Sequence, residues 1–258
     1  MAIAAAPAVA FALLADWLAP RVPFEVEVHL AGRFSDKIGA SGDVQSYLQA
    51  LSDRMAQAQR LPSGMSVKLH YREEPVVNAF ATLGGHVVVY RGLLRLVPDE
   101  NTLAMVLAHE VAHVRHRHPI TVLGRGLAMA AVIATVSGAA GNDVAGRALG
   151  DAGLLTQLSF SRAQEEDADA TALAALVQAY GHAGAAGELF ALMRKAARLS
   201  EPPKFLSTHP LSEARVARLA SLARERNWAS DGARTPLPAT VREQLAKDGA
   251  APARADQR

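Results

Sequence analysis

The sequence contains no cysteine among its 258 residues. This absence excludes disulfide bonds, a thiol nucleophile and thiolate metal sites, and it is compatible with every cellular compartment. Aromatic residues make up only 5% of the chain, and the formal net charge is +2. No basic stripe with interleaved aromatic residues is present, so a nucleic-acid partner has no support. Any metal site in this protein has to be built from histidine, aspartate and glutamate.

Charge is also missing from the beginning of the chain. Residues 2–15 are all apolar or small, and no Lys or Arg precedes them, which makes a poor secretory signal peptide. Extended to Ala19, the stretch approaches the ~20 residues that a membrane-spanning helix needs, and Trp17 and Arg21 suit a membrane interface. We expect residues 1–20 to form a membrane anchor or interfacial helix, with a soluble core helix as the alternative.

A second uncharged run covers residues 126–141 and is rich in alanine and glycine. It is too short for a confident membrane span. We expect this run to form a peripheral hairpin that touches the membrane, or a segment that gates access of the substrate.

The segment His109-Glu110-Val111-Ala112-His113 is an H-E-x-x-H sequence inside a helical apolar pattern. Two histidines four residues apart on a helix lie about 40° apart around its axis, so both imidazoles can reach one metal ion. Glu110 cannot bind that same ion, but it can reach a water held there. Its position in the apolar stripe is costly for a carboxylate without a partner or a function. The motif therefore predicts zinc-dependent hydrolysis, against the alternative of a solvated helix face.

A catalytic zinc ion needs a third protein ligand and an open position for water. The acidic segment 161–169 supplies candidates, and Glu165 and Asp169 share one helix face because they are four residues apart. We predict that Glu165 is the third ligand and that Asp169 accepts the outer N–H of a ligating histidine. The alternative is an ordinary acidic first turn, which the helix dipole favours.

Four ordered blocks resemble the HtpX/BepA-like zinc metallopeptidases, the gluzincin family that includes the CaaX prenyl proteases and the Oma-type proteases. The blocks are residues 78–94, 109–118, 161–169 and 207–215. The second is similar to the family pattern H-E-x-x-H-V-x-x-R-H, and the third to S-R-x-x-E-x-x-A-D. This resemblance implies that Glu110 is the general base, and it agrees with the assignments of Glu165 and Asp169. It also implies an integral or envelope-bound protein.

The resemblance further implies a role near the metal for His209, in the block Ser207-Thr208-His209-Pro210. In some relatives this histidine can occupy the fourth zinc position and hold the enzyme latent; a simple turn residue before Pro210 is the alternative. Arg215 could stabilise the oxyanion or make an ion pair. We expect His116 and His118 to be structural or solvated rather than ligands.

Apolar periodicity predicts an α+β fold, with many helices beside a small antiparallel sheet. Alternation indicates a strand over residues 67–71, and a β-branched run indicates another over His86-Val87-Val88-Val89-Tyr90. Helical spacing predicts helices over residues 44–55, 99–118, 162–180, 183–198 and around 216–222. We divide the chain into the apolar segment 1–20, a zinc metallopeptidase domain over 21–229, and a loosely packed tail over 230–258 with one helical turn around 241–247.

Together these features predict an endopeptidase with one Zn²⁺ ion that cleaves unfolded or misassembled proteins at the membrane of a bacterial cell envelope, with the periplasmic face favoured. The strand His86–Tyr90 is the predicted sheet edge on which an extended substrate pairs, and an ordinary buried strand is the alternative. The second function is a chaperone-like binding module with a latent zinc site. A thermolysin-like secreted protease is disfavoured, because Glu165 lies 52 residues after His113.

Overall fold

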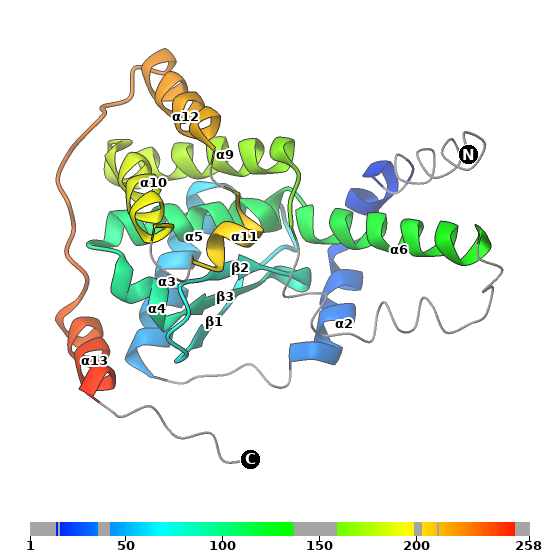
Figure 1. Cartoon of the computed structure of the whole chain (residues 1–258), viewed down its shortest axis with the longest axis horizontal. Helices are drawn as coiled ribbons and strands as arrows, with labels where there is room; N and C mark the ends of the chain where they lie inside the picture. Colours follow the sequence, from blue (N-terminus) through cyan, green and yellow to red (C-terminus); the bar gives the residue numbers. More distant parts are fainter. Residues whose placement is uncertain are drawn as a thin grey trace.

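A buried helix, α5 (Glu100–Arg115), lies between helix α9 (Arg162–Tyr180) and a three-stranded sheet (Figure 1). The computed structural model describes residue 14 and residues 16–35, 42–136, 159–198, 203–210 and 212–250. The carboxylate of Asp99 accepts the N–H of Thr102 at 2.7 Å and so caps the first turn of α5. Residues 100–114 are all buried, so the other layers of the fold pack around this helix.

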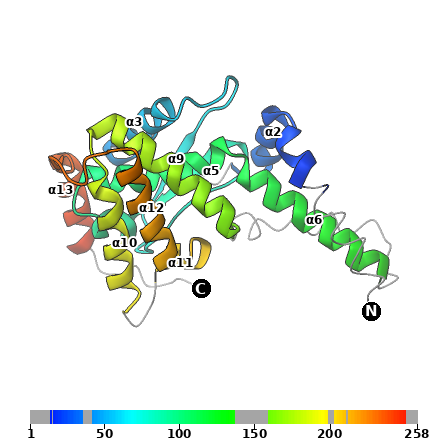
Figure 2. The ribbon, with the colours of Figure 1, turned by 90° about the horizontal axis from the view of Figure 1, so that it is seen from above.

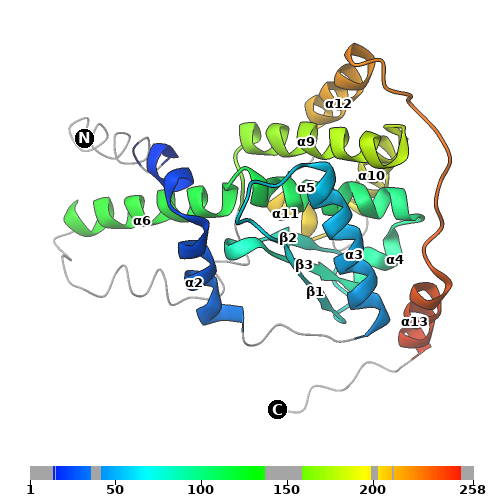
Figure 3. The ribbon, with the colours of Figure 1, turned by 180° about the vertical axis from the view of Figure 1, so that it is seen from behind.

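Several shorter elements surround α5. In chain order they are η1 (Ala19–Arg21), α2 (Phe24–Ser35), α3 (Asp43–Ala58), α4 (Arg91–Leu96), α6 (His118–Val136), α10 (Gly184–Ala196), α11 (Phe205–Thr208), α12 (Glu213–Glu225) and α13 (Ala239–Ala250). Figure 3 shows α3 crossing α5 on the side away from α11 and α12. The main core joins leucines of α3, α5 and α9, including Leu48, Leu103, Leu107, Leu173 and Leu176.

The sheet contains β1 (Lys68–Arg72), β2 (Ala79–Ala81) and β3 (His86–Tyr90) in the order β1-β3-β2. β3 pairs parallel with β1 and antiparallel with β2. The α+β class is confirmed, but the predicted antiparallel sheet is in fact mixed. The chain reverses after β1 and again after β2, and β3 then enters between the two earlier strands, so it runs in the same direction as β1.

The strand order also shows that the proposed substrate edge is wrong. Val87, Val88 and Val89 of β3 are each paired with β1 on one side and with β2 on the other, so His86–Tyr90 has no open edge on which an extended peptide could pair. Four of its five residues, His86 to Val89, are buried. The strand is therefore an ordinary buried strand, as the alternative interpretation predicted. β2 lies at an edge of the sheet.

The helices predicted from periodicity are present. The helix predicted over 162–180 is α9, with the same bounds, and the segments 44–55 and 216–222 lie inside α3 and α12. The helix predicted over 99–118 is interrupted: α5 ends at Arg115, Arg117 takes a left-handed conformation with φ +59°, and α6 begins at His118.

The C-terminal segment packs on the main core along part of its length. Leu237, Val241 and Leu245 are buried there, which is closer packing than the composition of residues 230–258 indicated. Arg95 of α4 donates to the carbonyl of Leu245 at 2.6 Å. The helical turn predicted around 241–247 lies inside α13.

Helix α6 extends away from the body of the molecule together with the N-terminal elements (Figure 2). A small second core of Ala19, Ala31, Leu83, Ile120 and Leu123 joins α6 to η1 and α2. Among the described residues, no helix combines the length and the apolar character needed to cross a membrane. Residues 1–13 and 15 of the predicted anchor and residues 137–141 of the second apolar run lie outside the described residues.

Candidate metal centre

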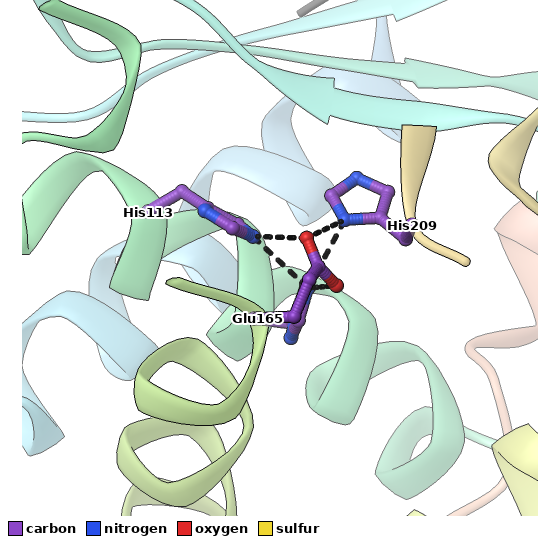
Figure 4. Close-up of side chains that lie close together, drawn as sticks. His113, Glu165 and His209 are labelled. Carbon is purple, nitrogen blue, oxygen red and sulfur yellow. Dashed lines mark hydrogen bonds and ion pairs between the residues drawn. The ribbon is translucent and has the colours of Figure 1, made fainter. Parts of the chain in front are cut away.

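Four potential metal ligands from three elements converge beneath the sheet. His109 and His113 are on α5, Glu165 is in the first turn of α9, and His209 directly follows α11. Each is almost completely buried. Figure 4 shows His113, Glu165 and His209 pointing toward one another. The structure therefore brings together the two motif histidines, the predicted third ligand and the histidine that the resemblance placed near the metal.

A capping box sets the position of Glu165. The hydroxyl of Ser161 accepts the N–H of Gln164, and the amide oxygen of Gln164 accepts the N–H of Ser161 at 3.0 Å. This reciprocal pair fixes the first turn of α9. Because α9 packs along α5, the next residue, Glu165, faces the histidine pair.

The distances between donor atoms fit one tetrahedral zinc ion. A tetrahedron with metal–ligand bonds of about 2.0–2.1 Å has edges of about 3.3 Å. The observed edges are His109 Nε2–His113 Nε2 at 3.1 Å, His109 Nε2–His209 Nδ1 at 3.2 Å, His209 Nδ1–Glu165 Oε1 at 3.0 Å and His113 Nε2–Glu165 Oε1 at 3.4 Å. Three imidazole nitrogens this close repel one another unless a proton or a cation lies between them, so the donor set fits a bound cation.

Asp169 lies where the sequence predicted it, behind a ligating histidine. Its Oδ1 is 3.0 Å from Nδ1 of His109 and can accept the outer N–H of that ring, which orients the ring toward the metal. Arg215 holds the same carboxylate through Nε and Nη2, at 2.7 and 2.8 Å. A buried carboxylate that is paired in this way stays ionised.

Of the two roles considered for Arg215, oxyanion stabilisation and ion pairing, the contacts of its side chain show ion pairing. Its Nη1 lies 2.7 Å from Oε2 of Glu165 and 2.9 Å from the carbonyl oxygen of Pro210. The hydrogen bonds to Asp169 and Pro210 use three of its five N–H donors, and the contact with Glu165 is an ion pair. The guanidinium thus ties both carboxylates of α9 to α12 and has little capacity left for an oxyanion.

The electrostatics of the cluster favour deprotonated carboxylates. Burial raises the pKa of Glu165, but hydrogen bonds from the three histidines outweigh it and bring the pKa well below its usual range. Burial opposes the charged form of His109 as well, yet hydrogen bonds to Asp169 and Glu165 raise its pKa to about 10. For His113 burial dominates, and its pKa falls well below 6.5.

Glu110 is a buried carboxylate of this site with few polar contacts. Neither of its oxygens makes a hydrogen bond within the described part of the chain. Nε2 of His209 lies 3.4 Å from Oε1, within ion-pair distance. An unsatisfied buried carboxylate is costly, which agrees with a group that acts on a ligand or substrate.

Aromatic rings close the site, and the sequence analysis missed them. Phe160 stacks on His113 with 3.9 Å between ring centroids, and Phe205 stacks on His209 at 4.6 Å. The cavity beside the cluster has a volume of only about 10 Å³, about enough for one water molecule. Phe160 directly precedes the Ser161 block, and this adjacency was the available sequence signal.

The helical core, the small sheet and this donor set define the class of H-E-x-x-H metallopeptidase domains with a glutamate as third ligand, the gluzincins. The comparison with known families is specific: the model of peptidase family M48 matches residues 43–223. The chain belongs to this family.

Curated relatives support the same assignment. The chain is 35% identical over 159 residues to the beta-barrel assembly-enhancing protease of Escherichia coli, covering 55% of this chain and 31% of that protein. It is 36% identical over 164 residues to the mitochondrial metalloendopeptidase OMA1 of Schizosaccharomyces pombe, covering 61% and 48%. A protease HtpX homolog of Aeropyrum pernix is 38% identical over 127 residues, covering 40% of each chain. The chain thus spans a third to a half of the length of these relatives.

The raised pKa of His109 predicts proton release on zinc binding. Without metal its ring is protonated at pH 7.5, and zinc binds only the neutral ring. Calorimetry at pH 7.5 in buffers of different ionisation enthalpy should show release of about one proton per zinc ion. Zinc affinity should rise with pH up to about 10. The same shift stabilises the metal-free fold below pH 6.5, and this contribution is lost as the pH rises through about 10.

Asp169→Asn is the matched control for this prediction. It removes the charge that raises the pKa of His109 and should reduce the number of protons released. Zinc binding by the unaltered protein without proton release would contradict the prediction.

Proposed function

We propose that this protein is a zinc-dependent endopeptidase. The observation that carries the proposal is the placement of Glu110: its buried carboxylate makes no hydrogen bond among the described residues, and it lies on the same helix turn as two ligands of a four-donor cluster. Zinc held by His109, His113 and Glu165 would lower the pKa of a bound water toward 7 and polarise a substrate carbonyl.

Glu110 would then do the proton transfer. One of its carboxylate oxygens would accept the proton of the attacking water, and the resulting carboxylic acid would donate it to the nitrogen of the leaving amine. Asp169 would keep the outer N–H of His109 in place during this step, and Arg215 would hold Asp169 and Glu165 in their orientations. The contacts of Asp169 and Arg215 support these two positioning roles.

We further propose that the arrangement seen here is latent, as His209 supplies a fourth donor. Four protein ligands complete a tetrahedral zinc site and leave no position for water. His209 directly follows α11, a helix of only four residues, Phe205–Thr208. Removal of the His209 ring would leave the fourth zinc position open for water. It would also remove the His209 Nε2 atom that lies beside Glu110.

The outer edge of β2, which pairs with no other strand among the described residues and whose three residues are buried, is the proposed docking site for substrate, in place of β3. Asn78 and Thr82 bond to β3, through Tyr90 N–H to Asn78 O at 3.1 Å and Thr82 N–H to His86 O at 2.8 Å. Because backbone groups alternate along a strand, those of Ala79 and Ala81 point away from β3. An extended substrate can pair with these groups by backbone hydrogen bonds, largely without regard to its side chains.

This mode of docking suits unfolded or misassembled proteins. We propose a role in protein quality control at the membrane of a bacterial cell envelope, on its periplasmic side. A relative with the name beta-barrel assembly-enhancing protease is consistent with this proposal.

The projecting unit of α6 and the N-terminal elements is the proposed membrane contact. The large apolar side chains that are exposed in the described residues all lie in this unit: Leu14, Trp17, Leu18, Val26 and Met129. Asp16 pairs with Arg125 of α6, and the guanidinium of Arg21 lies 4.1 Å from the Trp17 ring centre. Apolar side chains beside arginines and a tryptophan are typical of a helix that lies in the membrane interface.

Glu110→Gln tests the catalytic assignment. The amide cannot take the proton, so cleavage of casein should fall by about 10²–10⁴-fold, while zinc content stays at one per chain. Glu243→Gln, an exposed glutamate of α13, should leave cleavage unchanged. Full activity of Glu110→Gln would refute the role. Zinc-bound protein that binds unfolded casein without cutting it, even with His209 replaced, would instead favour the chaperone-like module.

His209→Ala tests latency. Loss of the fourth donor should raise the rate of casein cleavage on the order of ten-fold, since the competent state is no longer a minor population. Zinc should stay bound through the other three ligands. His29→Ala, an exposed histidine of α2, serves as the matched control. A rate equal to that of the unaltered protein would show that His209 does not block the site.

The membrane contact is tested by co-flotation of the full chain with anionic phospholipid vesicles. Replacing Trp17 and Leu18 together by serine should weaken binding by about ten-fold or more, because two apolar side chains no longer enter the interface. Serine at the exposed positions Ala214 and Ala217 of α12 should leave binding unchanged. Equal flotation of both double variants would contradict the proposal.

A further inference from the structure

His113 has a hydrogen-bond partner, His118, that lies outside the H-E-x-x-H motif. Nε2 of His113 faces the cluster, and its Nδ1 lies 2.8 Å from Nδ1 of His118. A neutral imidazole that binds a metal through Nε2 carries its hydrogen on Nδ1 and must donate it to an acceptor. We propose that His118 is a positioning residue of the zinc site, which accepts the Nδ1–H of His113 and orients that ring toward the metal.

The break between α5 and α6 makes this contact possible. In a continuous helix, residues five apart are separated by about 140° around the axis, so the two rings would point in different directions. Instead α5 ends at Arg115, and Arg117 has φ +59°, a conformation that costs free energy for a residue other than glycine. The turn returns His118 to the face of α5 that carries His113.

The surroundings hold this turn in place. The guanidinium of Arg117 binds the buried carboxylate of Glu27 at 2.6 Å and the carbonyl of Val22 at 2.7 Å. Glu27 also accepts the N–H of Gly84 at 3.2 Å. The strained residue is thus tied to α2 and to the turn before β3, so the beginning of α6 has one position relative to α5.

The ring of His118 is held as well. It is 5% exposed and stacks on His116, with ring centroids 5.3 Å apart and an interplanar angle of 16°. Nε2 of His116 lies 2.8 Å from the hydroxyl of Thr171, on the same helix as Glu165. A chain of contacts therefore leads from one zinc ligand, His113, through two further histidines to the helix that carries another.

The two motif histidines consequently have different partners. His109 donates to the carboxylate of Asp169, whose charge is balanced by Arg215. His113 donates to an imidazole, which makes no ion pair within the described residues. An imidazole partner adds no further buried carboxylate behind His113, so no additional buried charge has to be balanced there.

Matched substitutions at His118 test the proposal. Asparagine places Oδ1 close to the position of the histidine Nδ1 and can still accept a hydrogen bond, whereas leucine has the same branched shape without an acceptor. We expect His118→Leu to weaken zinc binding by about 10–100-fold in competition with a chromogenic chelator, and His118→Asn to stay within about three-fold of the unaltered full chain. Zinc binding by His118→Leu at the unaltered affinity, or equal weakening by both variants, would overturn the proposal.

A second measurement does not depend on the variants folding. In the zinc-loaded unaltered protein, nitrogen-15 NMR should show the His113 Nδ1–H protected from exchange and scalar coupling between the two Nδ1 atoms across the hydrogen bond. An exchanging, uncoupled Nδ1–H would refute the assignment. The inference rests on the zinc site of the proposed function but not on peptidase activity: a protein that binds zinc and cleaves nothing could still pass both tests.

Discussion

Three imidazole nitrogens and a carboxylate oxygen lie within contact distance of one another in the buried interior, and the surrounding architecture follows from that constraint. Polar groups cannot be buried without partners, and like donors cannot converge without a cation. Helix α5 supplies two of the donors and is buried along almost its whole length. α9 must therefore run directly alongside it, because only close packing brings Glu165 to the same point.

The residues that contact the metal donors from behind are buried as well, and they also need hydrogen-bond partners. Asp169 is satisfied by His109 and Arg215, and Arg215 in turn by Pro210 and Glu165. His113 is satisfied by His118, whose position depends on a left-handed residue tied to Glu27. Glu110 stands apart from this network, because neither of its carboxylate oxygens makes a hydrogen bond among the described residues. This lack of hydrogen bonds is the feature on which its proposed catalytic role rests.

The parts of the site that could be predicted from the sequence are those that depend on local geometry. His109, Glu110 and His113 follow from helical spacing, and Glu165 and Asp169 from the same spacing on a second helix. The strand order was not accessible, because the insertion of β3 between β1 and β2 is a non-local pairing that alternation does not encode. The contact of His118 with His113 was not predicted, since a left-handed arginine, unlike a glycine, gives no local signal of a helix break. The sequence left Arg215 undecided between two roles, and the contacts of its side chain assign the ion pair.

The hydrogen bond from Phe205 N–H to Val77 O, at 3.2 Å, has a consequence for how such an enzyme would be activated. Val77 belongs to the same alternation as Ala79 and Ala81, so α11 occupies the start of the edge proposed for substrate, and His209 directly follows α11. An incoming chain that competes for this edge would displace the His209 ring in the same movement. Occupancy and activation would then be a single event, and folded neighbours, which offer no free strand, would be spared.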